Sequence, residues 1–297
     1  MATPVVARLP RRALTFQGHR QEVVRRLLRK PLAIAGTILM LIMVLSAVFA
    51  PTIAPFAPDD QGIGDPFSPP SARHLFGTDQ FGRDVFSRVA FGGRISLQIG
   101  LIAVAIGGSV GLVLGCVAGY LSGWTDETVM RIIDIMLAFP GILLAIAVVV
   151  VLGPSLYNLM IAVGVGAIPT FSRVVRASVL DAKERDYVTA ARAMGISDFK
   201  IVARHILPNI MAPFIVLATL DVATAILSGT ALSYLGMGAK PPTPEWGLML
   251  SDGRDFIRNA WWVGTFPGLA ITITVIGINL LGDGLRDALD PRLRGTR

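Results

Sequence analysis

The chain of 297 residues is unusually apolar, since 53% of its residues are hydrophobic and 16% are charged, against about 25% charged residues in an average soluble domain. Its formal charge of +7 would raise nucleic acid as a partner for a soluble protein, but the basic residues lie in short segments between apolar runs, where membrane insertion places them. The lone Cys116 excludes a disulfide framework, and no P-loop or HExxH sequence is present.

Six apolar runs are long enough to cross a bilayer, which takes about 17 to 25 residues. They lie at 32–53, 96–119, 132–153, 156–172, 210–232 and 262–281. The fourth is short and contains Pro169. Small residues at Val48 and Ala50 also resemble a signal-peptide cleavage site, but the first run exceeds the usual apolar region of such peptides, so we expect it to stay as a helix. The sequence therefore predicts an all-α, multi-pass membrane protein with about six transmembrane helices.

The basic residues predict the orientation of these helices. Of the 27 Lys and Arg residues, 20 lie in the N-terminal segment, the second-to-third connection, the 173–209 loop and the tail, and seven lie in the other connections. By the positive-inside rule the larger set is cytoplasmic, so both termini are expected inside the cell.

The two outer connections, 54–95 and 233–261, are rich in proline and glycine, which predicts turns and irregular backbone. The second connection also carries Trp246, Trp261 and Trp262. We expect these tryptophans to anchor the chain at the membrane interface, and a docking surface for an extracytoplasmic partner is the alternative.

Glycines recur at every fourth position of the second run, at Gly107, Gly111, Gly115 and Gly119. This spacing predicts a smooth helix face that another helix approaches closely. The pattern leaves open whether that helix belongs to this chain or to a partner subunit.

The stretch 181–209, which we call the elbow, reads DAKERDYVTAARAMGISDFKIVARHILPN. Its first half has good helix formers and ends at Gly195, a plausible C′ residue. Ser197 is expected to cap a second short helix, and Pro208 to terminate it. The alternative is an ordinary basic loop that only sets the topology.

The residues Thr189, Ala190, Ala191, Gly195 and Pro208 resemble the EAA loop of ABC importer permeases, with Thr189 in place of the acidic first residue and His205 at the usual Ile position. The segment FGTDQFGRD, which begins at Phe76, and the segment 229–250 resemble the C-type permease subunit of dipeptide and oligopeptide ABC importers. Together these likenesses cover about 31–291, in the order of that family.

The resemblance implies a type I ABC importer permease fold and a permease subunit in the inner or plasma membrane that is not itself an enzyme. Its partners would be a homologous B-type permease, two ATPase subunits or domains, an extracytoplasmic substrate-binding protein and membrane lipid, with no nucleic acid. ATP and magnesium would be bound by the ATPase partners, so no cofactor or metal is expected in this chain. The implied divisions are a basic cytoplasmic segment at 1–31, the first helix and outer connection at 32–95, the ABC importer transmembrane domain at 96–282 and a cytoplasmic tail at 283–297.

In this family the elbow of each permease sits in a groove on an ATPase domain. Carried over to this chain, Ala190, Ala191 and Gly195 would permit close packing at that joint. The candidate polar contacts are Arg185, Asp186 and Arg192. The family's substrates include dipeptides, longer peptides, nickel complexes and haem, and the sequence does not choose among them.

Asp221 lies near the middle of the fifth run, where a carboxylate is costly and is by default a functional-site hypothesis. It either makes a structural hydrogen bond, for instance to Thr219 or Thr224, or lines the pathway or its gate. The runner-up function, a secondary transporter or channel working alone, would need ionisable residues along a path through several spans. Only Asp134 and Asp221 fall inside the predicted runs.

Overall fold

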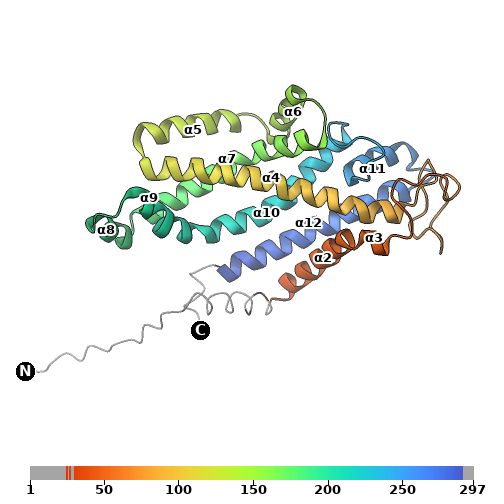
Figure 1. Ribbon diagram of the computed structural model, residues 1–297, viewed down its shortest axis with the longest axis horizontal. Helices are drawn as coiled ribbons and strands as arrows, with labels where there is room; N and C mark the ends of the chain where they lie inside the picture. The colour runs from red at the N-terminus through yellow and green to blue at the C-terminus, as the bar shows by residue number, and fades with distance from the viewer. Residues whose placement is uncertain (1–24, 26, 28–29, 290–297) are drawn as a thin grey trace, which may run out of the picture.

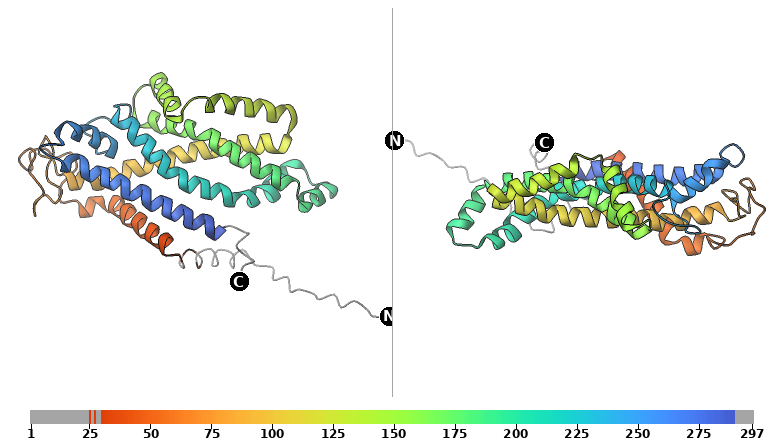
Figure 2. Two further views of the ribbon diagram at one scale, coloured as in Figure 1. Left: turned by 180° about the vertical axis from the view of Figure 1, so that it is seen from behind. Right: turned by 90° about the horizontal axis from the view of Figure 1, so that it is seen from above.

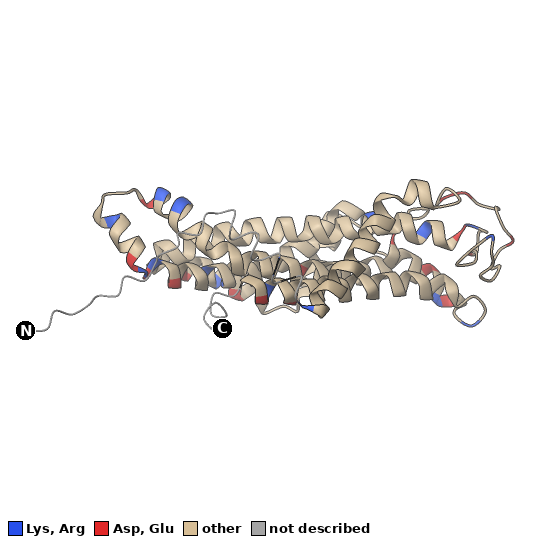
Figure 3. Ribbon diagram, turned by 90° about the horizontal axis from the view of Figure 1, so that it is seen from below, with Lys and Arg blue, Asp and Glu red and all other residues tan. Residues whose placement is uncertain are grey.

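The computed structural model describes Arg25, Leu27 and residues 30–289, and every regular element in that part of the chain is a helix. Most of the predicted 1–31 segment and the last eight residues of the predicted tail lie outside the described residues. Figure 1 shows an elongated bundle whose long helices run side by side along the longest axis. Charged residues gather toward the two ends of that axis, and a smaller number lie along the length between them (Figure 3). A bundle that crosses a bilayer needs a mostly apolar middle.

Among the described residues, five helical segments are long and apolar enough to span a membrane, and a bent pair of helices makes a sixth if it is counted as one span. The predicted all-α architecture with about six membrane helices is therefore confirmed. The five are α2 (Pro31–Val48), α4 (Val85–Leu121), α7 (Leu156–Lys183), α10 (Leu207–Tyr234) with the helical turns that precede it, and α12 (Trp262–Leu289).

Several helices have boundaries that the apolar runs did not mark. α4 begins at Val85, well before residue 96, because the Asp84 carboxylate accepts a hydrogen bond from Ser87 N at 2.8 Å and caps the helix. α7 continues through Pro169 to Lys183 and is a full-length span. The first predicted span is divided, since α2 stops at Val48 and a short helix α3 (Ala50–Ile53) follows.

The third predicted span, 132–153, is wrong as a single helix. The structure has α5 (Gly123–Leu137) and α6 (Gly141–Leu152), bent by 91° relative to each other. Pro140 lies at the break, where it lacks an N–H and disfavours helical backbone at Phe139. α6 has 12 residues, which gives it a length of about 18 Å, short of the roughly 30 Å of hydrocarbon. The pair is therefore a broken span or a re-entrant segment.

The glycine face of α4 packs on α7 of the same chain. A Cβ atom built on Gly107 would lie 2.7 Å from Gly164 O, and one on Gly115 would lie 2.6 Å from Ser172 O. Gly111 and Gly119 meet Phe171 and Val179 in the same way. All four glycines thus allow the backbones of α4 and α7 to approach closely, which settles the choice that the sequence left open.

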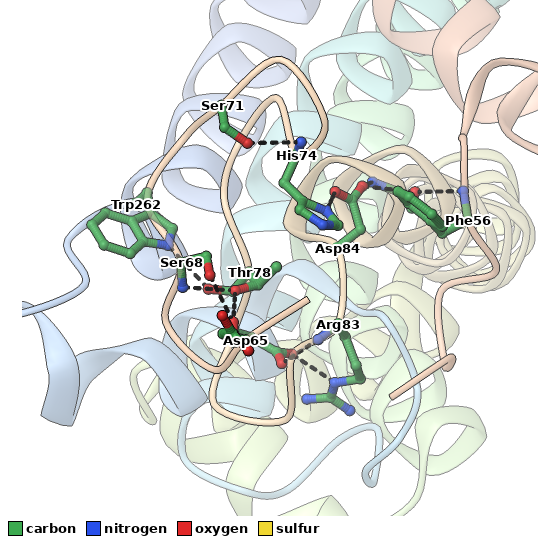
Figure 4. Close-up of polar contacts among 11 residues, drawn as sticks. Phe56, Asp65, Ser68, Ser71, His74, Thr78, Arg83, Asp84 and Trp262 are labelled. Atoms are coloured by element: carbon green, nitrogen blue, oxygen red, sulfur yellow. Dashed lines mark hydrogen bonds and ion pairs between the residues drawn. The ribbon is translucent and has the colours of Figure 1, made fainter. Parts of the chain in front are cut away.

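Residues 54–84, which we call the cap, fold over the end of the bundle opposite the elbow (Figures 1 and 2). Its core is polar: Asp79 accepts a hydrogen bond from Arg83 Nε at 2.6 Å, and both side chains are buried. His74 Nδ1 lies 2.9 Å from Asp84 Oδ1, and Figure 4 shows the two side chains facing each other. The FGTDQFGRD segment therefore builds this folded cap and the start of α4.

The expectation that the tryptophans anchor the chain at the membrane interface is wrong for two of the three. Trp246, which opens α11 (Trp246–Gly253), and Trp262 are buried, and their indole N–H groups donate to Val89 O and Thr78 O. The chain between α10 and α12 folds back among the helices, so these rings fill a hydrophobic cluster and find backbone acceptors there. Trp261 is half-exposed.

Candidate functional site

The elbow lies at one end of the bundle and connects α7 to α10 (Figures 1 and 2). Its first arm is α8 (Asp186–Ala193), which ends as the sequence predicts: Gly195 has φ +74° at the C′ position. Gly195 N donates to Arg192 O and Ile196 N donates to Ala191 O. This pair of bonds is a Schellman motif, which satisfies the last carbonyls of α8 and reverses the chain.

The second arm begins with α9 (Asp198–Ile201), with Ser197 at its N-cap position but without a side-chain capping bond. A turn of π-helix (Val202–Ile206) follows and leads into α10. The expectation that Pro208 ends this arm is wrong. Pro208 lies in the first turn of α10, directly after the π-helical turn. The helix runs without a break from Asp198 to Tyr234, so the second arm is continuous with the membrane helix.

The interior of the elbow is packed against the bundle. Val188, Ala191 and Ile201 are buried in one cluster with residues from the ends of α4 and α7, including Tyr120 and Val175. Ala191 therefore packs inside this chain. A movement of the elbow would carry the ends of α4 and α7 with it, because a packed interface of this kind does not deform freely.

The other elbow residues singled out from the sequence lie on the outer surface. Arg185 donates to Asp181 Oδ2 at 2.8 Å, one helical turn earlier, and Asp181 raises the pKa of its guanidinium. The residues of this set that are exposed are Arg185, Asp186, Thr189, Ala190, Arg192, Gly195 and Pro208.

Two large apolar side chains at the tip of the elbow were not predicted from the sequence as part of the site. Met194 is 72% exposed and Phe199 is 82% exposed, on either side of the Gly195 turn. Separately, a groove of about 830 Å³ lies at the base of the elbow, lined by residues from the end of α7 and the starts of α8 and α10, among them Asp181, Tyr187 and Asn209. Large apolar side chains that are exposed in this way are typical of a protein-docking surface. The pattern Met-Gly-x-x-x-Phe is the only signal that the sequence offered for it.

Asp221 lies in the middle of α10 and is half-buried. Within the described residues its carboxylate makes no hydrogen bond and no ion pair, and Thr219 donates instead to Ile215 O at 2.8 Å. The neighbouring positions Leu217 and Ala225 pack into the cluster shared with α4 and α7. Asp134, the other carboxylate of the predicted runs, pairs with Arg173 at 2.6 Å. The hydrogen bonds to Thr219 or Thr224 that the sequence offered for Asp221 are thus not formed.

No group of three or more His, Cys, Asp or Glu side chains suited to a metal ion exists in the part of the chain that the structure describes. A helical bundle with an apolar middle, a bent helix pair and a protruding elbow defines the class of the protein: a polytopic membrane protein. The comparisons with known proteins make that class specific.

The chain belongs to the family described as binding-protein-dependent transport system inner membrane component, whose model matches residues 111–295. A second model, the N-terminal TM domain of oligopeptide transport permease C, matches residues 20–70. The chain is therefore a membrane permease subunit of an ABC importer, and the predicted family is confirmed.

Similar curated proteins include the dipeptide transport system permease protein DppC of Alkalihalophilus pseudofirmus, 48% identical over 92% of this chain and 90% of that protein. The di/tripeptide transport system permease protein DppC of Pseudomonas aeruginosa is 48% identical over 89% of each chain. The glutathione transport system permease protein GsiD of Escherichia coli is 47% identical over 92% of this chain and 91% of that protein.

Among solved structures, the inward-facing MetNI methionine ABC transporter matches with a TM-score of 0.57 and 22% identity. The match covers 68% of this chain and 96% of the other. At this identity the likeness concerns the fold, and it confirms the ABC importer permease fold that the resemblance implied.

Proposed function

We propose that this chain is the C-type permease of an importer of short peptides, forms half of the translocation pathway and is driven by ATPase partners that grip its elbow. The peptide substrate is supported by the similar proteins, whose names refer to dipeptides, di- and tripeptides and glutathione. The elbow as the ATPase-docking site is supported by the exposed surface around Gly195, with Met194 and Phe199 at its tip.

The assembly that we propose contains a homologous B-type permease, two ATPase subunits or domains and an extracytoplasmic binding protein. ATP and magnesium are bound by the ATPase partners. Both termini and the elbow of this chain face the cytoplasm, a placement supported by the 20 basic residues on that side against seven on the other.

In this assembly ATP binding closes the ATPase pair, moves the elbows together and opens the permease outward, and hydrolysis resets it. ATP drives such a cycle only because it binds the two conformations with different affinity. Thr189, Ala190 and Gly195 lie at the ATPase joint, with Arg185, Asp186 and Arg192 as polar contacts on the same surface, and Pro208 continues the second arm into α10.

Reconstitution of the complete transporter in liposomes tests this function. ATPase activity should rise when binding protein and a dipeptide are added. Labelled dipeptide should accumulate in the liposomes only when ATP is present on the side of the membrane that the ATPase subunits face. Mass spectrometry of small molecules that co-purify with the complex would identify the natural substrate. Uptake by the purified chain alone, without an ATPase, would instead support a secondary transporter or channel.

A further inference from the structure

Tyr120, in the last turn of α4, contacts both arms of the elbow. Its hydroxyl donates to the carboxylate of Asp198, the first residue of α9. The guanidinium of Arg192, in the last turn of α8, lies over the tyrosine ring at 5.4 Å from the centroid. The ring itself is buried in the cluster that also holds Ala191 and Ile201. One side chain of α4 thus binds the arm before the Gly195 turn and the arm after it.

The α4–α5 turn, which follows Tyr120, is bound to the end of α7 that leads into the elbow. Lys183 Nζ donates to Gly119 O at 3.2 Å and to Ser122 Oγ at 2.5 Å. Arg176 forms a bidentate ion pair with Asp126, with nitrogen–oxygen distances of 2.5 and 2.6 Å. Bidentate pairs fix orientation as well as distance. The α4–α5 turn is therefore held to α7 by two charged side chains and to the elbow by Tyr120.

The helix that begins at this turn, α5, has one further charged attachment, the ion pair of Asp134 with Arg173 of α7 at 2.6 Å, and is otherwise loosely packed. Ile133 is the one buried residue of α5, and the break at Pro140 separates α5 from α6. Ile132 and Ile135 are among its exposed apolar side chains. Because α5 is held at its first turn and by one ion pair, and is weakly packed between them, it follows a movement of that turn together with the end of α7.

We propose that Tyr120 is a positioning residue that locks the elbow to the α4–α5 turn, so that displacement of the elbow is transmitted to α5 and the bent pair α5–α6. This inference rests on the proposed function, since it names the route by which ATPase movement reaches the membrane. Arg192 contacts the Tyr120 ring within the chain, and it is also exposed on the surface that the ATPase would meet.

The test compares Tyr120→Phe with wild type in the reconstituted transporter, measuring peptide uptake and ATP hydrolysis in the same vesicles. The variant keeps the ring under Arg192 and removes only the hydroxyl. The number of peptides transported per ATP should fall about fivefold, which corresponds to about 1 kcal/mol, the usual net contribution of one hydrogen bond. Asp198→Asn removes the same bond from the other side and should give a similar loss. Tyr157→Phe is the matched control, because Tyr157 is 75% exposed, and its ratio should equal that of wild type.

A second measurement follows the geometry directly. In a Cys116→Ala background, spin labels at Lys200→Cys on α9 and Glu127→Cys on α5 report the distance between the elbow and the start of α5. This distance should be single and unchanged by ATP in the wild-type sequence, and it should broaden in Tyr120→Phe.

The outcomes separate the two proposals. A complete wild-type transporter that shows no ATP-dependent uptake would overturn the proposed function and this inference with it. Wild-type uptake combined with an unchanged ratio of peptide to ATP and an unchanged spin-label distance in Tyr120→Phe, even if that variant is less stable, would overturn the positioning role of Tyr120 alone.

Discussion

Gly111→Ala tests the closest approach of α4 and α7. A Cβ atom at this position would lie 2.4 Å from Phe171 Cβ and 3.0 Å from Ser172 N. Because both atoms belong to the inflexible part of α7, rotation of a side chain cannot relieve the clash, and the helices must separate. Overpacking of this kind costs about 1 to 3 kcal/mol, whereas alanine in place of a helical glycine otherwise stabilises by about 1 kcal/mol. The loss of stability observed for Gly111→Ala should therefore be the difference between the cost of overpacking and the gain from replacing glycine.

Gly264→Ala is the matched control, since Gly264 also lies in a long helix, α12, and a Cβ there meets nothing within 4 Å. It should be neutral or slightly stabilising, so the two variants should differ by about 1 to 3 kcal/mol. Thermal unfolding of the purified complex, followed by tryptophan fluorescence, measures this difference as several degrees of midpoint, at about 2 to 4 °C per kcal/mol. Equal midpoints for the two variants would refute the tight α4–α7 contact.

Three further predictions concern the elbow, the membrane carboxylate and the orientation. Gly195→Asp should abolish uptake and leave membrane insertion intact, because only the αL turn and the docking surface change; normal uptake would remove Gly195 from the coupling. Asp221→Asn should alter uptake differently for peptides of different charge, measured across a labelled series, and unchanged uptake and stability would assign Asp221 no role in the pathway. An alkaline phosphatase reporter fused within 233–261 should be active, and an inactive fusion would reverse the topology.

The membrane spans could be predicted from the sequence because long apolar runs have few other stable solutions in a chain of this length. The end of α8 could be predicted as well, since Gly195 occupies the C′ position of that helix, where the αL turn requires a positive φ. The glycine spacing of α4 predicted a close helix contact, but only the structure identifies α7 as the neighbouring helix.

The features that could not be predicted from the sequence depend on tertiary contacts or on a helix-breaking residue within an apolar run. The break of the third run lies at Phe139 and Pro140, where hydropathy stays high, and the Pro-Gly dipeptide was the available signal. Trp246 and Trp262 were predicted to be interface anchors from their place between two apolar runs. Their burial depends on how helices that are distant in the sequence enclose the indole rings, which no local pattern shows. The bond from Tyr120 to Asp198 joins residues 78 positions apart, and no local pattern predicts such a pair.

Site-specific photo-crosslinking from the tip of the elbow tests the central claim most directly. A photoreactive residue at Met194 or at Phe199 should crosslink to the ATPase in the assembled transporter, and the yield should change when ATP is added. The same residue at the exposed Tyr157 on α7 should give no such product. Crosslinks to the ATPase from Tyr157, with none from Met194 or Phe199, would contradict the account of the elbow as the site that the ATPase grips.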